Sequence, residues 1–177
     1  MPSADAHNWD ELVQEHQEAV FRLAYLMLGD ADEAADVTQE AFINAYKARD
    51  RYDPSRPVRP WLMRICANLA RNRRRSISRY FAALRRLLAG EPEPMTAAEH
   101  SVKSIDAQAL WQAVRRLSAS DQEVIYLRYF LDMPEAEMAM ALNVAQGTVK
   151  SRLHRALGRL RDVVQREFPG LKEEFDT

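Results

Sequence analysis

The sequence predicts an all-α protein made of two small helical domains joined by a flexible linker, with a helix-turn-helix in the C-terminal domain. Three observations support this fold class. Apolar residues recur at helical spacing through nearly all of the 177 residues, and no stretch alternates as a strand would. A polar segment with several prolines interrupts this pattern near the middle of the chain. Beyond it, the spacing of Ala139, Asn143 and Val149 suits two closely crossing helices.

The first two helices are expected to follow each other after only a short break. Apolar residues recur over Trp9–Leu28, and Gly29 should end this helix, because glycine readily adopts the left-handed conformation that closes many helices. Asp30 should begin the next helix, since Glu33 follows three residues later in the pattern of a capping box. The expected inner stripe of this second helix is Ala34, Val37, Ala41 and Ala45.

A third helix is predicted after a turn that contains Asp53, Pro54 and Pro57. It should begin near Pro60, because a proline in the first helical turn removes no needed amide donor. The expected apolar face of this helix consists of Trp61, Ile65 and Leu69.

The composition changes over residues 88–104, where AGEPEPMTAAEHSVKS follows Leu88. This stretch is small and polar, contains prolines and has no helical stripe until its end, as is typical of a linker. The sequence therefore predicts an N-terminal domain over residues 1–87 and a C-terminal domain over residues 105–177.

Four further helices are expected in the C-terminal domain. Their predicted ranges are Asp106–Leu117, Asp121–Leu131, Pro134–Leu142 and Gln146–Arg166. Ser120, with Glu123 three residues later, is expected to cap the second of these helices. Asp132 is expected to cap the third, which places Pro134 in a first turn.

The last two helices have the spacing of a helix-turn-helix, in which the second helix enters the major groove of DNA. Ala139 is small enough for a close crossing, Asn143 tolerates a left-handed turn, and Val149 is placed to anchor the second helix. The alternative is a plain helical hairpin with a solvated outer face. If the pair binds DNA, the residues expected at or near the groove are Gln146, Thr148, Lys150, Ser151, His154 and Arg155.

Charged residues lie in blocks, although the formal net charge is only −1. No acidic residue occurs between Asp53 and Glu91, where arginines are frequent. The reverse holds from Leu23 to Tyr46, which contains acidic residues but no Lys or Arg. Basic residues dominate again from Lys150 to Arg166, where Asp162 is the single acidic residue. Basic segments of this density can follow a phosphate backbone, although single charge runs are commonly only solvated helix faces.

Several classes of function are not supported by the sequence. No apolar run approaches the ~20 residues of a membrane span, and the N-terminus does not resemble a secretory signal, so we expect a cytoplasmic protein without membrane insertion. Cys66 is the single cysteine, and the four histidines show no metal-ligand spacing. Because there is also no phosphate-binding loop and no nucleophile–base motif, we expect no metal, no cofactor and no enzymatic activity.

Five stretches carry a family resemblance. GTVKSRLHRALGRLR resembles the C-terminal domain of extracytoplasmic-function (ECF) sigma factors of the sigma-70 family, and DQEVIYLRYFLDMPEAEMAMALNV precedes it as it does there. WDELVQEHQEAVFRLAYLMLGD resembles the opening helix of that family, EAADVTQEAFINAYKA its polymerase-binding helix, and RPWLMRICANLARNRRR its −10-reading helix. The stretches occur in the order and at the spacing of the family.

The resemblance implies a factor that directs core RNA polymerase to specific promoters and helps to initiate transcription. It assigns docking on the polymerase clamp and −10 recognition to the N-terminal domain, and −35 recognition to the C-terminal helix-turn-helix. Core RNA polymerase, promoter DNA and an anti-sigma factor are the implied partners. The implied polymerase-binding residues are Asp36, Gln39 and Glu40. The implied −10 residues are Arg64, Asn68, Arg71, Asn72, Arg74 and Arg75, with Trp61 as either a core residue or a stacking platform for an unpaired base.

Some positions depart from the family pattern. Ala35 stands in the acidic helix where Glu is common, and Asn143 replaces the turn glycine. Two other interpretations stay open: a different helix-turn-helix regulator, such as a response-regulator output domain, or an all-helical protein-interaction module. The first would not account for the arginine-rich stretch after Trp61, and only a sigma factor should co-purify with RNA polymerase subunits.

Overall fold

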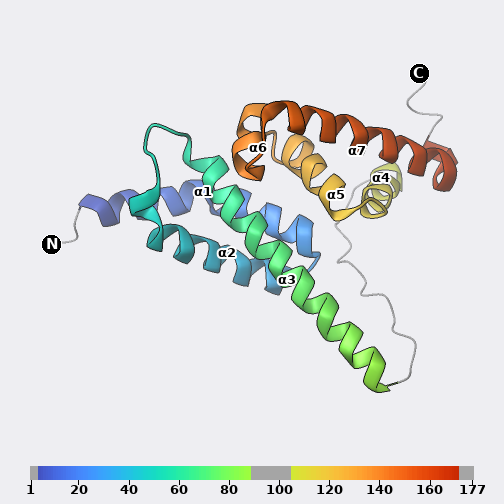
Figure 1. The fold of residues 1–177 in the computed structure, drawn as a ribbon, viewed down its shortest axis with the longest axis horizontal. Coiled ribbons are helices and arrows are strands. Elements are labelled where there is room, and N and C mark those ends of the chain that lie inside the picture. The colour runs from blue at the N-terminus through green and yellow to red at the C-terminus, as the bar shows by residue number, and fades with distance from the viewer. Residues whose placement is uncertain (1–3, 89–104, 172–177) are drawn as a thin grey trace. The chain divides into compact units, whose positions relative to one another are not determined.

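The computed structural model describes residues 4–88 and 105–171, with side chains described over residues 9–80 and 108–170. Every regular element in these ranges is helical, which confirms the all-α prediction. The chain divides into two compact units, Met1–Ala97 and Ala98–Thr177 (Figure 1). Of the predicted linker, only Leu88 is described, and it is the last residue of a helix; residues 89–104 lie outside the described ranges.

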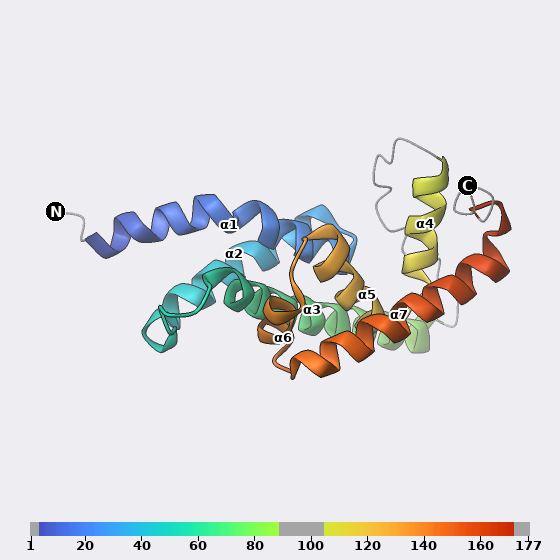
Figure 2. The ribbon, with the colours of Figure 1, turned by 90° about the horizontal axis from the view of Figure 1, so that it is seen from above.

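Three long helices build the first unit. They are α1 (Ala4–Leu28), α2 (Ala31–Lys47) and α3 (Val58–Leu88), with a short 3₁₀ helix, η1 (Arg49–Arg51), after α2. Each long helix packs against the other two, and they lie side by side in both ribbon views (Figures 1 and 2). The buried apolar residues include Val20, Leu23, Ala24, Leu26 and Met27 from α1, Ala34, Val37, Ala41, Phe42 and Ala45 from α2, and Leu62, Met63, Cys66, Ala67 and Ala70 from α3. The predicted inner stripe of α2 is therefore confirmed.

The junction between α1 and α2 has the predicted helix end and helix start. Gly29 has a φ of 76°, the left-handed conformation, and its N–H donates to the Tyr25 carbonyl over 2.8 Å. The Asp30 side chain then accepts the N–H of Glu33 over 2.8 Å and caps α2. The Glu33 carboxylate lies 3.0 Å from Nη1 of Arg73, so it links α2 to α3.

The buried face of α3 differs from the predicted one. Trp61, Ile65 and Leu69 are only half-buried and lie along one edge of the packed surface. The core contacts come instead from Leu62, Met63, Cys66, Ala67 and Ala70, which recur every three or four residues as a helix face requires. Small residues at three of these positions allow α3 to approach its neighbours closely, whereas the larger Trp61 remains at the edge.

The turn before α3 is closed by local hydrogen bonds. The Asp53 carboxylate accepts from the Ser55 hydroxyl over 2.7 Å and from the Ser55 amide over 3.0 Å, and these bonds lower the pKa of Asp53. The Tyr52 hydroxyl donates to the Arg56 carbonyl. The Tyr52 ring packs against Trp61 with 4.8 Å between ring centroids, so Trp61 contributes to fixing this turn on the start of α3.

The second unit begins with α4 (Ile105–Arg115) and α5 (Ala119–Ile125). The chain continues as a π-helical turn, η2 (Tyr126–Phe130), then α6 (Glu135–Leu142), α7 (Gln146–Glu167) and a 3₁₀ turn, η3 (Pro169–Leu171). The π turn arises because the Leu131 amide donates to the Tyr126 carbonyl, five residues back, over 3.1 Å. The core of this unit contains Ala113, Val114, Val124, Leu127, Met133, Met138, Ala141, Val149, Leu153, Ala156 and Val163.

Two predicted helix caps in this unit are wrong. Ser118, not Ser120, caps α5: its hydroxyl oxygen accepts the Asp121 amide over 3.3 Å. Asp132 does not cap α6, because it lies in a left-handed turn with a φ of 50°. Helix α6 instead begins directly after Pro134, without a side-chain cap.

The turn between α6 and α7 has the geometry expected of a helix-turn-helix. Asn143 is left-handed, with φ 55° and ψ 48°, and the Val144 amide donates to the Ala139 carbonyl over 3.0 Å. Val149 is fully buried and anchors α7 against its neighbours. The role predicted for Asn143 is confirmed, since asparagine adopts this conformation more readily than most non-glycine residues.

Candidate nucleic-acid and polymerase interface

One side of α7 carries the polar residues expected to contact DNA. Gln146, Lys150, Ser151, His154 and Arg155 are exposed. Thr148 is half-buried. The opposite side is formed by the buried residues Val149, Leu153 and Ala156. The helix therefore has one apolar side that packs within the unit and one long polar side that is open to a partner.

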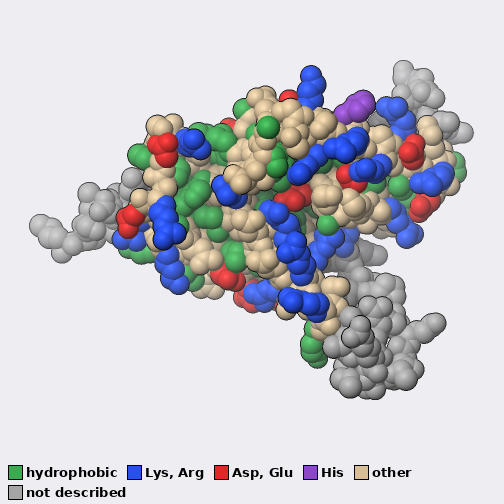
Figure 3. Space-filling model, viewed as in Figure 1, with side chains coloured by type: hydrophobic (Ala, Val, Ile, Leu, Met, Phe, Trp, Pro, Cys, Tyr) green, Lys and Arg blue, Asp and Glu red, His purple; other side chains and the backbone are tan. Residues whose placement is uncertain are grey.

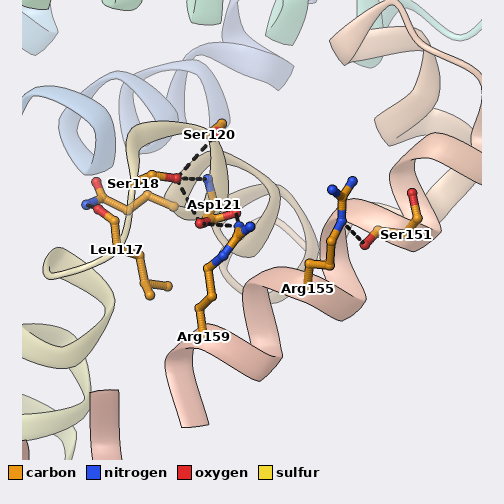
Figure 4. Close-up of polar contacts among 8 residues, drawn as sticks. Leu117, Ser118, Ser120, Asp121, Ser151, Arg155 and Arg159 are labelled. Carbon is orange, nitrogen blue, oxygen red and sulfur yellow. Dashed lines mark hydrogen bonds and ion pairs between the residues drawn. The ribbon is translucent and has the colours of Figure 1, made fainter. Parts of the chain in front are cut away.

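Local hydrogen bonds order part of this polar side. The Ser151 hydroxyl donates to the Thr148 carbonyl over 3.0 Å. Nε of Arg155 donates to the Ser151 carbonyl over 3.2 Å (Figure 4). The second bond holds the stem of Arg155 along the helix. Lys150 and His154 are one helical turn apart, so their side chains project from neighbouring positions on the same face.

Lys and Arg side chains gather along α7 and along α3 in the space-filling view (Figure 3). On α3, Arg64, Asn68, Asn72 and Arg75 are exposed, and Arg71 and Arg74 are half-buried. Arg71 donates to the Asn68 side-chain oxygen over 2.8 Å and to the Ala67 carbonyl over 3.1 Å. Because Oδ1 of Asn68 accepts from Arg71, the Asn68 amide group is held in one orientation with its N–H donors on the outer side.

Arg73 has a different environment from the neighbouring arginines. It lies 3.0 Å from Glu33 and 3.9 Å from Glu40, both on α2. This pair of contacts fastens α3 to α2, so Arg73 stabilises the unit while Arg74 and Arg75 face other directions. The sequence alone could not separate these consecutive arginines, because their partners are far away in the chain.

The predicted polymerase-binding residues share one exposed face of α2. Asp36, Gln39 and Glu40 are all exposed, and Gln39 and Glu40 follow Asp36 by three and four residues, so both lie beside it on the helix surface. Glu40 also lies 3.9 Å from Arg73 on α3, whereas Asp36 is not a partner in the ion pairs that join the described parts of α2 and α3. A substitution at Asp36 therefore tests this face without also breaking a contact between α2 and α3.

A groove between α1 and α2 extends from this acidic face and was missed in the sequence analysis. Its volume is about 880 Å³, and Gln39 belongs to its wall. Three large apolar side chains are exposed beside it: Phe21 at 37%, Ile43 at 45% and Tyr46 at 45%. The sequence does contain a feature that predicts this groove: Ile43 and Tyr46 are apolar residues of α2 that do not belong to its inner stripe of alanines and Val37. The other lining residues are Trp9, Val13, Gln17, Glu18, Ala35, Thr38, Phe42 and Lys47.

No group of metal-ligating side chains occurs among the residues that the structure describes. Within the same residues, no helix is both long enough and apolar enough to span a membrane.

The chain is similar to known proteins over both units. Residues 12–80 match the model of Sigma-70 region 2, and residues 107–160 match that of Sigma-70, region 4. The sequence is 34% identical over 169 residues to the ECF RNA polymerase sigma factor SigL of Mycobacterium tuberculosis, covering 92% of both chains. It is 31% identical over 166 residues to the ECF RNA polymerase sigma factor SigW of Bacillus subtilis, covering 89% of both.

Similar folds occur among solved structures. CnrH, in complex with the cytosolic domain of CnrY, has a TM-score of 0.68 and 25% identity, covering 93% of this chain and 92% of that one. The sigma factor RpoE of Bartonella quintana, in complex with the anti-sigma factor NepR, has a TM-score of 0.67 and 23% identity, covering 90% and 98%. The second likeness bears on the fold alone.

These matches decide between the readings that the sequence left open. A response-regulator output domain would not account for the match to region 2, and an unrelated interaction module would account for neither match. Identity above 30% extends over nearly the whole length of the curated relatives. The chain therefore belongs to the ECF sigma factors of the sigma-70 family, regulatory proteins that bind core RNA polymerase and direct it to promoter DNA for the initiation of transcription.

Proposed function

We propose that the first unit docks on core polymerase through α2 and holds the −10 region through α3, while the second unit reads the −35 element through α7. The observation that carries this proposal is the separation of three chemically different faces on three helices. One is acidic and apolar, one combines arginine with asparagine, and one combines Lys150, His154 and Arg155 with hydroxyl groups.

The face on α2 suits a protein partner better than DNA. Asp36 and Glu40 would be repelled by phosphates but complement a basic protein surface. The exposed Ile43 and Tyr46 add apolar area of the kind that dominates the binding energy at protein interfaces. We assign this combined surface to docking on the clamp of the polymerase.

The face on α3 suits a melted strand. Asn68 and Asn72 present amide groups that can bond to exposed base edges, and the arginines around them can contact phosphates. Arg71 holds the Asn68 amide in place, which favours a specific hydrogen bond over a mobile one.

The face on α7 suits duplex DNA in the major groove. Its N-terminal residues follow the turn of the helix-turn-helix, the part of a recognition helix that meets base edges in this motif. Lys150 and His154 are assigned to base contacts, Ser151 and Arg155 to supporting contacts, and Gln146 and Thr148 to the entrance of the helix.

An anti-sigma factor is proposed as a further partner, because RpoE was solved in complex with the anti-sigma factor NepR, and CnrH in complex with the cytosolic domain of CnrY. The apolar groove between α1 and α2 is the described surface best suited to such a chain. We also place the protein in the cytoplasm, where its polymerase is, and assign it no catalysis of its own. Run-off transcription with core polymerase on a promoter library tests the proposed function, and the absence of any promoter-dependent transcript would reject it.

The free protein is expected to bind promoter duplex weakly. Its acidic and basic segments oppose each other, and two tethered DNA-binding units gain affinity only when polymerase fixes their geometry. Gel shifts with and without core polymerase provide the measurement. Tight, sequence-specific binding by the protein alone would favour an ordinary repressor or activator.

The arginines and asparagines of α3 should behave differently on mutation. Arg74→Ala and Arg75→Ala are expected to lower transcription from all promoters similarly and to reduce the salt dependence by about one contact each, since phosphate contacts carry no sequence information. Asn68→Ala should instead relax preference within the −10 element. Salt titrations and promoter selection with core polymerase distinguish the two classes, and a changed −10 motif in the arginine variants would contradict the assignment.

A further inference from the structure

Asp121 is a nearly buried carboxylate at the start of α5, in a position that the DNA-binding face does not use. Its side chain is 8% exposed, and both of its oxygens accept from Nη1 of Arg159 on α7, over 2.7 and 2.8 Å (Figure 4). Oδ2 also accepts from the Ser118 hydroxyl over 2.8 Å. The carboxylate thus joins the cap of α5 to the middle of α7.

The next residue extends this junction to α4. The Gln122 amide group donates to the carbonyls of Arg115 and Leu117, over 3.1 and 2.8 Å, at the end of α4. Its oxygen accepts from the Tyr126 hydroxyl over 3.4 Å. The start of α5 is therefore tied to α4 by Gln122 and to α7 by Asp121.

Arg159 lies on the same side of α7 as two residues of the DNA-facing set, and it contacts Asp121 at the start of α5. It lies one turn after Arg155 and two turns after Ser151, so the three residues form one row along the helix. Within the part of the chain that the structure describes, Arg155 bonds to its own helix, whereas Arg159 turns to α5 (Figure 4). Two basic residues in the same row therefore have different partners.

The apolar contacts of α7 constrain its orientation less sharply than a directional hydrogen bond does. Burial of Val149 and Leu153 holds the helix against the unit, but hydrophobic contact is non-directional. A charge-assisted hydrogen bond to a buried carboxylate is directional. At a rise of 1.5 Å per residue, Lys150 is about 13 Å from Arg159 along the helix, so a tilt of about 10° there displaces it by about 2 Å. That displacement is enough to lose a base contact, because hydrogen bonds need a narrow range of distances.

We propose that Asp121 and Arg159 are positioning residues for −35 recognition: Asp121 holds Arg159 and so sets the orientation of α7 on α5, and Arg159 makes no phosphate contact. The proposal rests on the assignment of −35 reading to α7. It separates Arg159 from Arg155, which sequence position alone would place in the same basic row.

The test uses the full-length protein with core polymerase, at a temperature where circular dichroism shows every variant folded. Asp121→Asn keeps the size of the side chain and removes its charge, and Arg159→Lys keeps the charge of its partner with a different geometry. Arg159→Ala removes the partner entirely. Arg166→Ala is the matched control, because Arg166 is also exposed on α7 and bonds within its own helix, to the Asp162 carbonyl over 3.1 Å. Transcription is compared on promoters with an intact or a replaced −35 element, and likewise for −10.

Asp121→Asn and Arg159→Ala are each expected to reduce −35 discrimination about tenfold, with −10 discrimination unchanged. The double variant should lose no more −35 discrimination than either single variant, because both changes break the same contact between Asp121 and Arg159. Arg159→Lys should retain part of the discrimination, and Arg166→Ala all of it. The salt dependence should be unchanged in Arg159→Ala and reduced by about one contact in Arg155→Ala.

A lowered melting temperature with full −35 discrimination in Asp121→Asn would show a purely structural role and overturn the proposal. Additive losses in the double variant, or a reduced salt dependence in Arg159→Ala, would also overturn it. Lys150→Ala and His154→Ala are measured alongside. If they lose −35 discrimination while Asp121→Asn keeps it, only the positioning role fails; if they keep it as well, the assignment of α7 to the −35 element fails too.

Discussion

Lys150→Ala and His154→Ala are expected to change which −35 sequences the polymerase selects, while leaving the −10 preference as it is. Both side chains are exposed on the polar side of α7, one turn apart, and neither is needed for the apolar packing through Val149 and Leu153. A good contact to a base edge contributes ~1–3 kcal/mol of discrimination, or about 5- to 150-fold in relative promoter use. Each variant should therefore lose preference at one or two base pairs.

The measurement is selection from a promoter library randomised in both elements, with core polymerase present. Arg161→Ala serves as a control, because Arg161 is exposed and basic but lies about two turns beyond His154, further from the start of the recognition helix. Recovery of the wild-type −35 motif by both variants would mean that the recognition face is assigned to the wrong residues. A shifted −10 motif would instead contradict the division of labour between the units.

Features set by neighbours in the chain could be predicted from the sequence. The left-handed turn at Asn143, the end of α1 at Gly29 and the cap at Asp30 depend on residues a few positions apart, and all were found as predicted. The positions of the helices followed from apolar spacing for the same reason.

Features set by distant contacts could not be predicted. Ser118 and Ser120 each precede an acidic residue by three positions, so the local pattern fits either serine as the cap of α5. The bond that holds Asp121, the partner of Ser118, comes from Arg159, 38 positions away in the chain. The choice of Leu62 and Met63 over Trp61 as core residues of α3 depends on how closely α1 and α2 approach. The sequence could not separate Arg73 from Arg74 for the same reason, since the partners of Arg73 are on α2.

Asp36→Lys and Ile43→Ser are expected to reduce capture of core polymerase, and together they should nearly abolish it. Reversing the charge of Asp36 places a lysine against the basic surface expected on the clamp, a juxtaposition that costs several kcal/mol. Ile43 is 45% exposed beside the groove, and truncating it removes apolar area that the partner would bury. The expected loss of binding free energy is about 2 kcal/mol, or about 30-fold in affinity. The combined loss should exceed about a hundredfold.

Asp36 and Ile43 were chosen so that their replacement leaves the packing of α1, α2 and α3 intact. Glu40→Lys is less informative, because Glu40 lies 3.9 Å from Arg73 and a lysine there would also disturb the contact between α2 and α3. Tyr46 packs against Trp9, with 5.2 Å between ring centroids, so its replacement would loosen α1. Asp36 and Ile43 are both exposed, and neither is a partner in the ion pairs that join α2 to α3.

Two matched variants control for charge and for lost apolar surface. Glu15→Lys makes the same charge reversal on α1, at a side chain that is 76% exposed and forms no part of the groove. Leu110→Ser removes a 37%-exposed apolar side chain from the second unit. Pull-down of core polymerase, with circular dichroism of each variant, gives the comparison. Because a surface that is merely solvated should tolerate all four changes equally, wild-type capture by the Asp36→Lys/Ile43→Ser pair would remove α2 and its groove from the docking interface.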